Sequence, residues 1–274
     1  MSQPKPPVIA NPWGQLRQFT AARIALGRTG ASLPTQPQLA FQLAHARARD
    51  AVHQALDVAQ LLADAEAAGL SQGGETLVLH SQVDDRLEYL QRPDLGRRLN
   101  HASRDRLRAQ PTPPGRAYDV AIVVADGLSS LAVAQNAVPF LSALYRLLGK
   151  TTSLTPLAVV EHGRVAIGDE VGELLGAKAV LLLIGERPGL SSPDSMGAYL
   201  TWAPRVGLSD AARNCISNIR PDGLPCDEAA HKVHHLLGEM QARQLSGVGL
   251  KDETKAPDAV TGSLHGSFLL DGPP

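Results

Sequence analysis

The fold class is indicated most clearly by Lys178 to Ser192, KAVLLLIGERPGLSS. Six consecutive apolar residues, 179–184, run straight into a polar turn. A short apolar run without alternation is typical of a strand buried on both faces, as in a parallel sheet. A second run of this kind, DVAIVVA at 119–125, is also followed by an acidic residue and a glycine. Two such strands predict an open α/β sheet whose ligands bind just beyond the carboxyl ends of its strands.

The composition is that of a chain with a substantial aliphatic core. Its 274 residues are enough for one large domain or two small ones, and 43% of them are apolar but only 4% aromatic. A net charge of −1 gives no reason to expect nucleic acid or an anionic membrane as a partner. No apolar run approaches the roughly 20 residues of a membrane-spanning helix. The N-terminus lacks the apolar core of a signal peptide, so a cytoplasmic protein is expected.

The residues before position 110 predict a helical region. Trp13, Leu16 and Phe19 share one face of a helix expected over 13–26. Further helices are expected within 37–69, at 84–90 and at 94–109, and TLVLH at 76–80 predicts either a short strand or an extended link. The Pro-rich stretch QPTPPGR at 110–116 is the predicted domain boundary. The chain is thus divided into a flexible N-terminus (1–12), a helical region (13–110), an α/β domain (116–250) and a flexible tail (251–274).

Beyond the boundary, the pattern alternates between strands and helices. Strands are predicted at 118–125, 157–161, 179–184 and 215–219, helices at 169–175 and 227–245, and a loop rich in Ser, Gly and Pro between the last two strands. The helix after the first strand is expected to be interrupted, because Pro139 fits a first turn capped by Asn136 better than a helix interior. The order predicts a Rossmann-like, mostly parallel sheet flanked by helices.

The common phosphate-binding and catalytic motifs are missing. Gly149-Lys150-Thr151 resembles the end of a P-loop, but the preceding glycine is absent and the segment follows a helix. Neither predicted strand end carries G-x-G-x-x-G. His231 and His235 are spaced one helical turn apart, but two histidines make an incomplete metal site. We therefore predict no metal site and no complete catalytic constellation within this chain.

Single residues outside these motifs carry weaker signals. Glu186 follows a buried strand at the edge where α/β sheets bind ligands, although it could equally form an ion pair with an arginine. Cys215 begins a predicted strand, and a lone cysteine is more often a small buried hydrophobe than a functional group. Val165 carries no chemistry of its own and could contribute only contact surface. Seven arginines at 85–108 suggest a solvated helical face or a docking surface for an acidic partner or a phosphate.

Several runs together resemble the small (light) subunit of ethanolamine ammonia-lyase, an adenosylcobalamin-dependent enzyme. They fall in order between about residues 13 and 250, and GERPGL followed by CISNI is the most specific pair. The matching runs are TAARI at 20–24, RPDLGRR at 92–98, DGL at 126–128, GRV at 163–165, GDEVGELLG at 168–176, GERPGL at 185–190 and CISNI at 215–219.

The resemblance implies a small subunit that caps adenosylcobalamin against a larger barrel subunit, in a hetero-oligomer that deaminates ethanolamine to acetaldehyde and ammonia by a radical route. It implies cofactor contacts at Val165, Glu186 and Cys215, and assigns the capping role to residues 116–250. None of the nine histidines follows an aspartate by two positions, so a base-on cofactor is expected. The short Pro-rich N-terminus does not support entry into a bacterial microcompartment. The alternative is a stand-alone α/β binding module for another nucleotide-like ligand.

Overall fold

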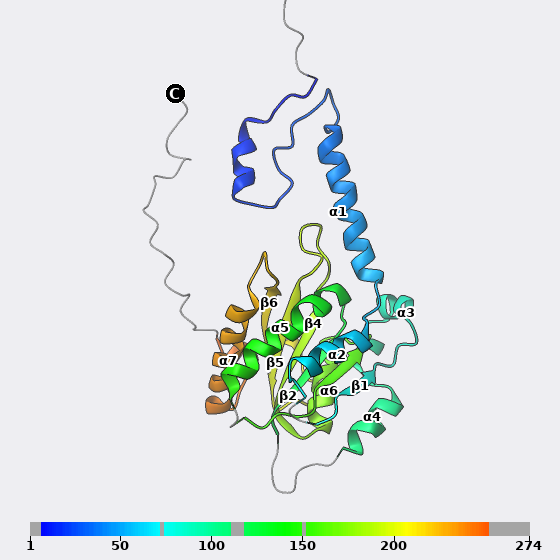
Figure 1. Cartoon of the computed structure of the whole chain (residues 1–274), viewed down its shortest axis with the longest axis vertical. Coiled ribbons are helices and arrows are strands. Elements are labelled where there is room, and N and C mark those ends of the chain that lie inside the picture. Colours follow the sequence, from blue (N-terminus) through cyan, green and yellow to red (C-terminus); the bar gives the residue numbers. More distant parts are fainter. Residues whose placement is uncertain (1–6, 72–73, 111–117, 150–151, 252–274) are drawn as a thin grey trace, which may run out of the picture.

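The chain forms a six-stranded mixed sheet flanked by helices, with an N-terminal helical region (Figure 1). The computed structural model describes residues 7–71, 74–110, 118–149 and 152–251. The strand order is β1-β3-β2-β4-β5-β6. The strands are β1 (Leu77–His80), β2 (Tyr118–Ala125), β3 (Ala158–Glu161), β4 (Ala177–Gly185), β5 (Met196–Trp202) and β6 (Arg213–Ile219). The predicted α/β class with a mostly parallel sheet is therefore confirmed.

The parallel half of the sheet is built from the apolar runs. β2 pairs with β4 from Tyr118 opposite Ala177 to Ala125 opposite Ile184, so the two predicted central strands are neighbours. β3 lies on the other side of β2, and β1 forms the edge. TLVLH is thus a strand of the sheet rather than a link. Because β2 and β4 are buried on both faces, their apolar runs need no alternation.

The antiparallel half contains a strand that the sequence did not predict. Residues 196–202 were expected to belong to a loop, but they form β5, which pairs antiparallel with both β4 and β6. The physical reason is that β5 needs only a short connection back from β4, and so has no preceding helix to mark it. Gly197 and a β-bulge between Met196 and Ala198 also weaken its strand pattern.

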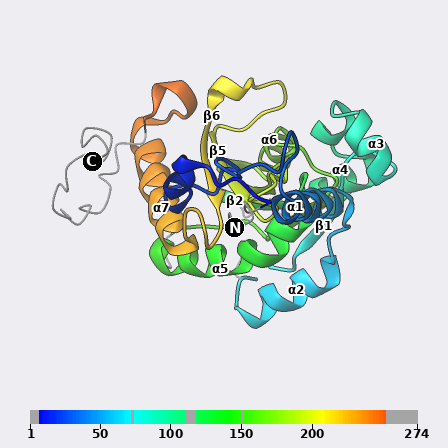
Figure 2. The same ribbon diagram turned by 90° about the horizontal axis from the view of Figure 1, so that it is seen from above.

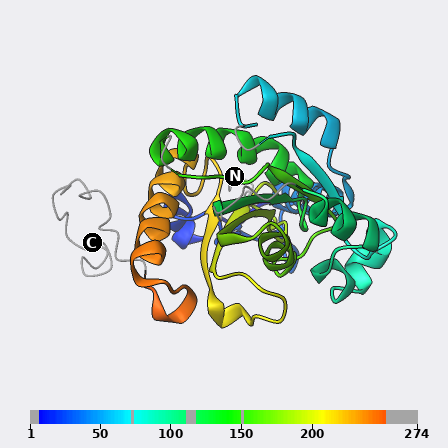
Figure 3. The same ribbon diagram turned by 90° about the horizontal axis from the view of Figure 1, so that it is seen from below.

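Helices cover the two faces of the sheet (Figures 2 and 3). On one face α5 (Ser130–Leu148), α7 (Cys226–Arg243) and α2 (Val58–Ala67) contribute to the larger apolar core. On the other face α6 (Ile167–Leu174) and α4 (His101–Arg108) cover β1, β3, β2 and β4. α6 packs on β4, whereas the same face of β5 and β6 carries partly exposed side chains.

Helix α5 is continuous through Pro139, so the predicted interruption is wrong. Pro139 lies on the exposed side of the helix, as does Gln135, whose carbonyl loses its helical partner. Water can therefore satisfy that carbonyl, which lowers the cost of proline here. The true N-cap is Ser129, whose hydroxyl accepts from the Ala132 amide at 3.1 Å. Among the described residues α5 is the one helix with the length and apolar composition of a membrane span, and its core position accounts for that composition.

The N-terminal region is helical but more broken than expected. The helix predicted at 13–26 is only a 3-10 turn, η1 (Pro12–Gln18). The long helical region divides into α1 (Thr35–His53) and α2. The next two predicted helices become α3 (Arg86–Gln91) and a short turn, η2 (Leu95–Arg97), followed by α4. Figure 1 shows α1 running away from the sheet, with η1 beside its far end.

The interruptions follow side-chain caps that begin new helices. The Asp57 side chain accepts from the backbone N–H of Gln60 at 3.0 Å, and the Asn100 side chain accepts from the backbone N–H of Ser103 at 2.8 Å. The predictions for 1–6, 111–116, 150–151 and 252–274 lie outside the described residues. The division into domains therefore stays a prediction.

Candidate functional site

The carboxyl ends of β2 and β4 are packed directly against each other. Leu128 N donates to Gly185 O at 2.9 Å. A Cβ at Gly127 would lie 2.2 Å from Gly185 O, and a Cβ at Gly185 would lie 1.9 Å from Ser129 O. Gly127, just after β2, and Gly185, the last residue of β4, are therefore required for close backbone approach. Because of these contacts, the ends of β2 and β4 leave no gap between them. The accessible candidate surface therefore lies beside β4, β5 and β6.

The acidic residue after β2 has a structural role. The Asp126 carboxylate is buried, and its Oδ1 accepts from Gly127 N at 2.8 Å and Gly163 N at 3.1 Å. Its Oδ2 lies 3.3 Å from Arg86 Nη1. Burial raises the pKa of Asp126 to about 6, against the opposing effect of Arg86. Asp126 thus ties the end of β2 to the turn after β3.

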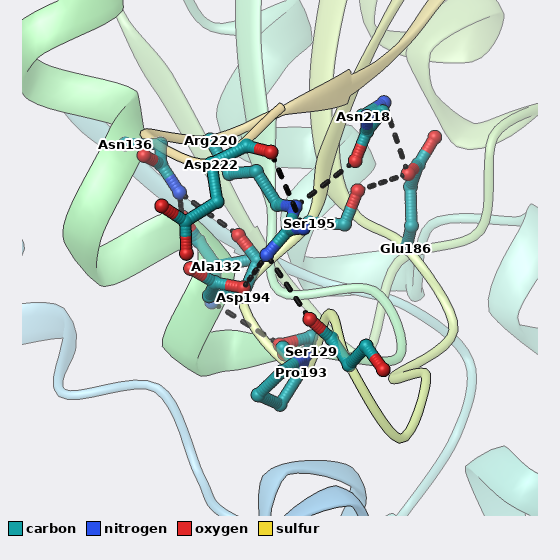
Figure 4. Close-up of polar contacts among 11 residues, drawn as sticks. Ser129, Ala132, Asn136, Glu186, Pro193, Asp194, Ser195, Asn218, Arg220 and Asp222 are labelled. Atoms are coloured by element: carbon teal, nitrogen blue, oxygen red, sulfur yellow. Dashed lines mark hydrogen bonds and ion pairs between the residues drawn. The ribbon is translucent and has the colours of Figure 1, made fainter. Parts of the chain in front are cut away.

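Glu186, after β4, is held through one carboxylate oxygen (Figure 4). Ser195 Oγ donates to Glu186 Oε2 at 2.5 Å, and Asn218 N donates to the same oxygen at 3.3 Å. Within the described parts of the chain, Glu186 has no ion pair and its Oε1 has no hydrogen-bond donor. The ion-pair alternative considered from the sequence is therefore not the arrangement that these residues adopt.

The loop that carries Glu186 is fixed by polar contacts from three other parts of the chain, two of which are drawn in Figure 4. Arg220, just after β6, donates to Ser191 O at 3.2 Å and to Asp194 Oδ1 at 3.2 Å. From α5, the Asn136 side-chain amide donates to Asp194 O at 3.0 Å. The third part is the N-terminal region, where Arg23 Nη2 donates to Leu190 O at 3.1 Å. The orientation of the Glu186 carboxylate is thus set in advance.

Tyr199, on the strand that sequence analysis missed, is the centre of the candidate site. Its direct cross-strand partner on β6 is Cys215, and burial together with the neighbouring Cys215 thiol raises the pKa of the Tyr199 hydroxyl. A Cβ at Gly197 would lie 3.0 Å from Glu186 Oε1 and 3.1 Å from Tyr199 Cε2. Gly197 therefore leaves room for the carboxylate and the ring to lie side by side. The available signal was the period-2 pattern of MGAYLTW, which the surrounding Ser, Gly and Pro residues obscured.

Val165 belongs to the same apolar cluster as Tyr199. It lies in the turn before α6, where it packs against the smaller apolar core together with Tyr199. The two residues also line one cavity of about 610 Å³. The structure therefore brings the three predicted residues, Val165, Glu186 and Cys215, around a tyrosine that was not predicted.

The Cys215 thiol is in an environment that favours its protonated form. The residue is exposed as a whole, but neighbouring atoms partly desolvate the thiol and so raise its pKa, and the charge of Glu186 adds to this effect. The neighbouring Tyr199 hydroxyl acts in the opposite direction and lowers the pKa of the thiol. A raised pKa is the reverse of what a nucleophilic cysteine needs. The geometry suits a contact residue.

The arginine-rich segment at 85–108 is only partly a solvated face. Arg86 pairs with buried Asp126, and Arg104 Nε donates to the buried Glu170 carboxylate at 2.6 Å. These two arginines therefore join the helical region to the α/β sheet. In the parts of the chain that the structure describes, no three His, Cys, Asp or Glu side chains gather as a metal site.

Comparison with known proteins gives a consistent result. The sequence profile of the family described as "Ethanolamine ammonia-lyase light chain (EutC)" matches residues 10–251. Similar proteins named "Ethanolamine ammonia-lyase small subunit" occur in Pseudomonas syringae pv. tomato, with 56% identity over 96% of this chain and 93% of the relative. The protein of the same name from Pseudomonas aeruginosa is 58% identical over 95% of this chain and 94% of the relative. That from Azotobacter vinelandii is 56% identical over 96% of this chain and 97% of the relative.

Proposed function

Because the chain belongs to the ethanolamine ammonia-lyase light-chain family, and so is the small subunit of a lyase, we propose that it binds adenosylcobalamin against a large subunit. The complete enzyme converts ethanolamine to acetaldehyde and ammonia by a radical mechanism. The observation that carries the proposal is the convergence of Val165, Glu186 and Cys215 around Tyr199. A hetero-oligomer of several large–small pairs and a cytoplasmic location accompany this proposal as predictions.

The chemistry of this face fits the rim of a corrin ring. A corrin carries amide side chains that donate hydrogen bonds, and Glu186 offers a pre-oriented carboxylate with one oxygen left over. Val165 and Tyr199 offer apolar and aromatic contact surface beside it. When bound, the cofactor supplies the radical chemistry. The residues of this chain bind it, orient it and exclude water from one side.

An apolar surface in the N-terminal region supports a large protein partner. Among the described residues, nine of the twelve exposed large hydrophobic side chains belong to residues 8–43. They are Val8, Ile9, Trp13, Phe19, Ile24, Leu33, Leu39, Phe41 and Leu43. Such a concentration is typical of a protein-binding surface. Arg23 connects this segment to the loop of Glu186, so partner binding and cofactor binding involve adjoining parts of the chain.

The axial ligand of cobalt is proposed to be the cofactor's own benzimidazole. The sequence has no Asp-x-His-x-x-Gly motif. His162, the histidine that follows β3, has its Nδ1 3.1 Å from His80 Nε2, so this nitrogen is already engaged within the protein. Electron paramagnetic resonance of the cobalt(II) state should show splitting from isotope-labelled benzimidazole. Splitting that follows labelled protein histidine instead would contradict a base-on cofactor.

The assembly experiment tests the function itself. The purified chain should not deaminate ethanolamine, with or without adenosylcobalamin, because its candidate residues bind a cofactor and none is directed at substrate. Addition of the cognate large subunit should give turnover and a complex that retains cobalamin through gel filtration. Turnover by the chain alone contradicts the proposed division of labour. Cobalamin binding with no large-subunit association would favour the stand-alone module.

A further inference from the structure

The cavity beside Val165 extends the candidate site away from Glu186. Its volume is about 610 Å³, and its wall includes Arg97, Arg164, Val165, Tyr199 and Leu208. The residues come from η2, the turn before α6, β5 and the loop after β5. One side of the cavity is therefore continuous with the proposed cofactor face, whereas the other side is cationic. None of the functions considered above uses this cationic side.

The positive charge of the cavity is not neutralised within the described chain. Neither Arg97 nor Arg164 has a carboxylate partner among the described residues. The acidic residue of the wall, Asp210, pairs at 2.9 Å with Arg213, which also pairs with buried Asp169, so Asp210 offsets part of the charge and the wall keeps a net positive charge from its two arginines. A smaller hollow of about 240 Å³ shares Arg97 and adds Arg98. The cavity therefore favours an anionic group.

Arg164 is held in place before any ligand arrives. Its Nη2 donates to Tyr89 O at 2.9 Å, and its guanidinium lies over the Tyr89 ring, 4.1 Å from the centroid. The backbone beside it is also fixed, because Arg164 N donates to Gly96 O at 2.7 Å. A Cβ at Gly96 would lie 2.8 Å from Arg164 Cγ, so the glycine leaves the path of the side chain open. A guanidinium fixed in this way binds a phosphate oxygen with a smaller loss of conformational freedom.

From this cavity we infer a subsite for a phosphodiester, with Arg97 and Arg164 as its cationic ligands. The inference rests on the proposed function, because the group it assigns to the cavity is the phosphodiester of the nucleotide loop of cobalamin. The apolar wall formed by Val165 and Leu208 suits the uncharged parts of that loop. Arg97 and Arg164 thus bind the nucleotide loop, while Glu186 and Cys215 contact the corrin.

The test compares two corrinoids on the assembled enzyme. Adenosylcobalamin carries the phosphodiester, and adenosylcobinamide lacks both it and the base. Equilibrium dialysis with absorbance detection gives the dissociation constant of each corrinoid for the unmodified enzyme and for Arg97→Gln, Arg164→Gln and the control Arg108→Gln. Arg108 is an exposed arginine on α4 that does not line the cavity. The control therefore makes the same charge change elsewhere.

Each of the two cavity variants should weaken adenosylcobalamin about tenfold and change adenosylcobinamide binding less than twofold. The control should change neither. Equal weakening of both corrinoids, or no weakening of either, would overturn the subsite. Arg97 is exposed on a short turn, so Arg97→Gln alone decides the matter if Arg164→Gln does not fold. An unmodified enzyme that binds neither corrinoid contradicts the proposed function instead.

Discussion

Tyr199 on β5 and Cys215 on β6 are direct cross-strand neighbours, and they place the candidate site on the face of the antiparallel strands. This face lies beyond the helix that covers β4, so its side chains remain partly accessible. Glu186 joins the pair from the loop after β4, and Val165 from the turn before α6. Four segments that are distant in sequence thus form one surface around a tyrosine ring.

Gly197 should be a sensitive position of this surface. Gly197→Ala adds a methyl group about 3 Å from both the Glu186 carboxylate and the Tyr199 ring, so one of them must move. We expect adenosylcobalamin binding by the assembled enzyme to weaken at least fivefold, roughly 1 kcal/mol. Gly238→Ala is the matched control, because nothing lies within 4 Å of a Cβ there. In helix α7 that change should stabilise the fold by up to about 1 kcal/mol. Equal cofactor affinities for the two variants would contradict the predicted crowding.

Cys215 should be dispensable for chemistry. Its raised thiol pKa disfavours the thiolate, so Cys215→Ala removes contact surface rather than a nucleophile. Turnover at saturating cofactor should remain substantial, with at most a modest loss of cofactor affinity. Steady-state assays over a range of adenosylcobalamin concentrations separate the two effects. Complete loss of turnover in a folded, cofactor-loaded assembly would overturn the contact role.

His162 should make stability fall in mild acid. Burial, together with the neighbouring His80 and Arg86, lowers the pKa of His162 to about 4, against an opposing effect of Asp85. The unfolded chain binds this proton near pH 6.5 and the folded chain only near pH 4. The contribution of His162 is therefore fully present above pH 6.5 and is lost as the pH falls from 6.5 to 4. After allowance for the partial exposure of His162, the free energy of unfolding should fall by about 1–2 kcal/mol.

His162→Asn isolates this contribution. His162 has a φ of 55°, a conformation that asparagine tolerates. The variant keeps the backbone contacts of Asp126. Because the pKa of Asp126 is raised, its contribution to stability has the opposite pH dependence and does not account for the acid-induced loss. Urea unfolding at pH 7 and pH 4.5 should show a larger acid-induced loss for the unmodified chain than for the variant. Identical pH dependence of the two would contradict the assignment to His162.

Residues 8–43 should be needed for association with the large subunit. Leu39 and Leu43 lie one turn apart on α1 and are 58% and 53% exposed. The double variant Leu39→Gln, Leu43→Gln should weaken association at least tenfold in analytical ultracentrifugation and leave the fold intact. The control is Leu87→Gln, which removes an equally exposed leucine from α3. Association that is unaffected by the double variant would remove this surface from the interface.

The sequence was most informative where burial alone determines structure. β2 and β4 are buried on both faces, so their apolar runs identified them and the sheet. β5 was missed because it lies in the antiparallel half, where Gly197 and a bulge break the pattern. Pro139 misled the prediction of α5, since the sequence does not reveal that this proline is on the solvent side. Tyr199 depends on tertiary pairing with Cys215, and so could not be identified before β5 was known.

The most direct test of the account is cofactor titration of assembled Glu186→Ala. Glu186 is positioned by Ser195 and Asn218 with one oxygen left for the ligand. Loss of a hydrogen bond to a charged group, about 1.5–3 kcal/mol, corresponds to roughly ten- to a hundredfold weaker binding. The control is Glu66→Ala on the exposed side of α2, which should bind normally. The account predicts this loss of adenosylcobalamin affinity, with a much smaller fall in turnover at saturation and an unchanged KM for ethanolamine. Unchanged adenosylcobalamin affinity in a well-assembled Glu186→Ala enzyme would contradict it.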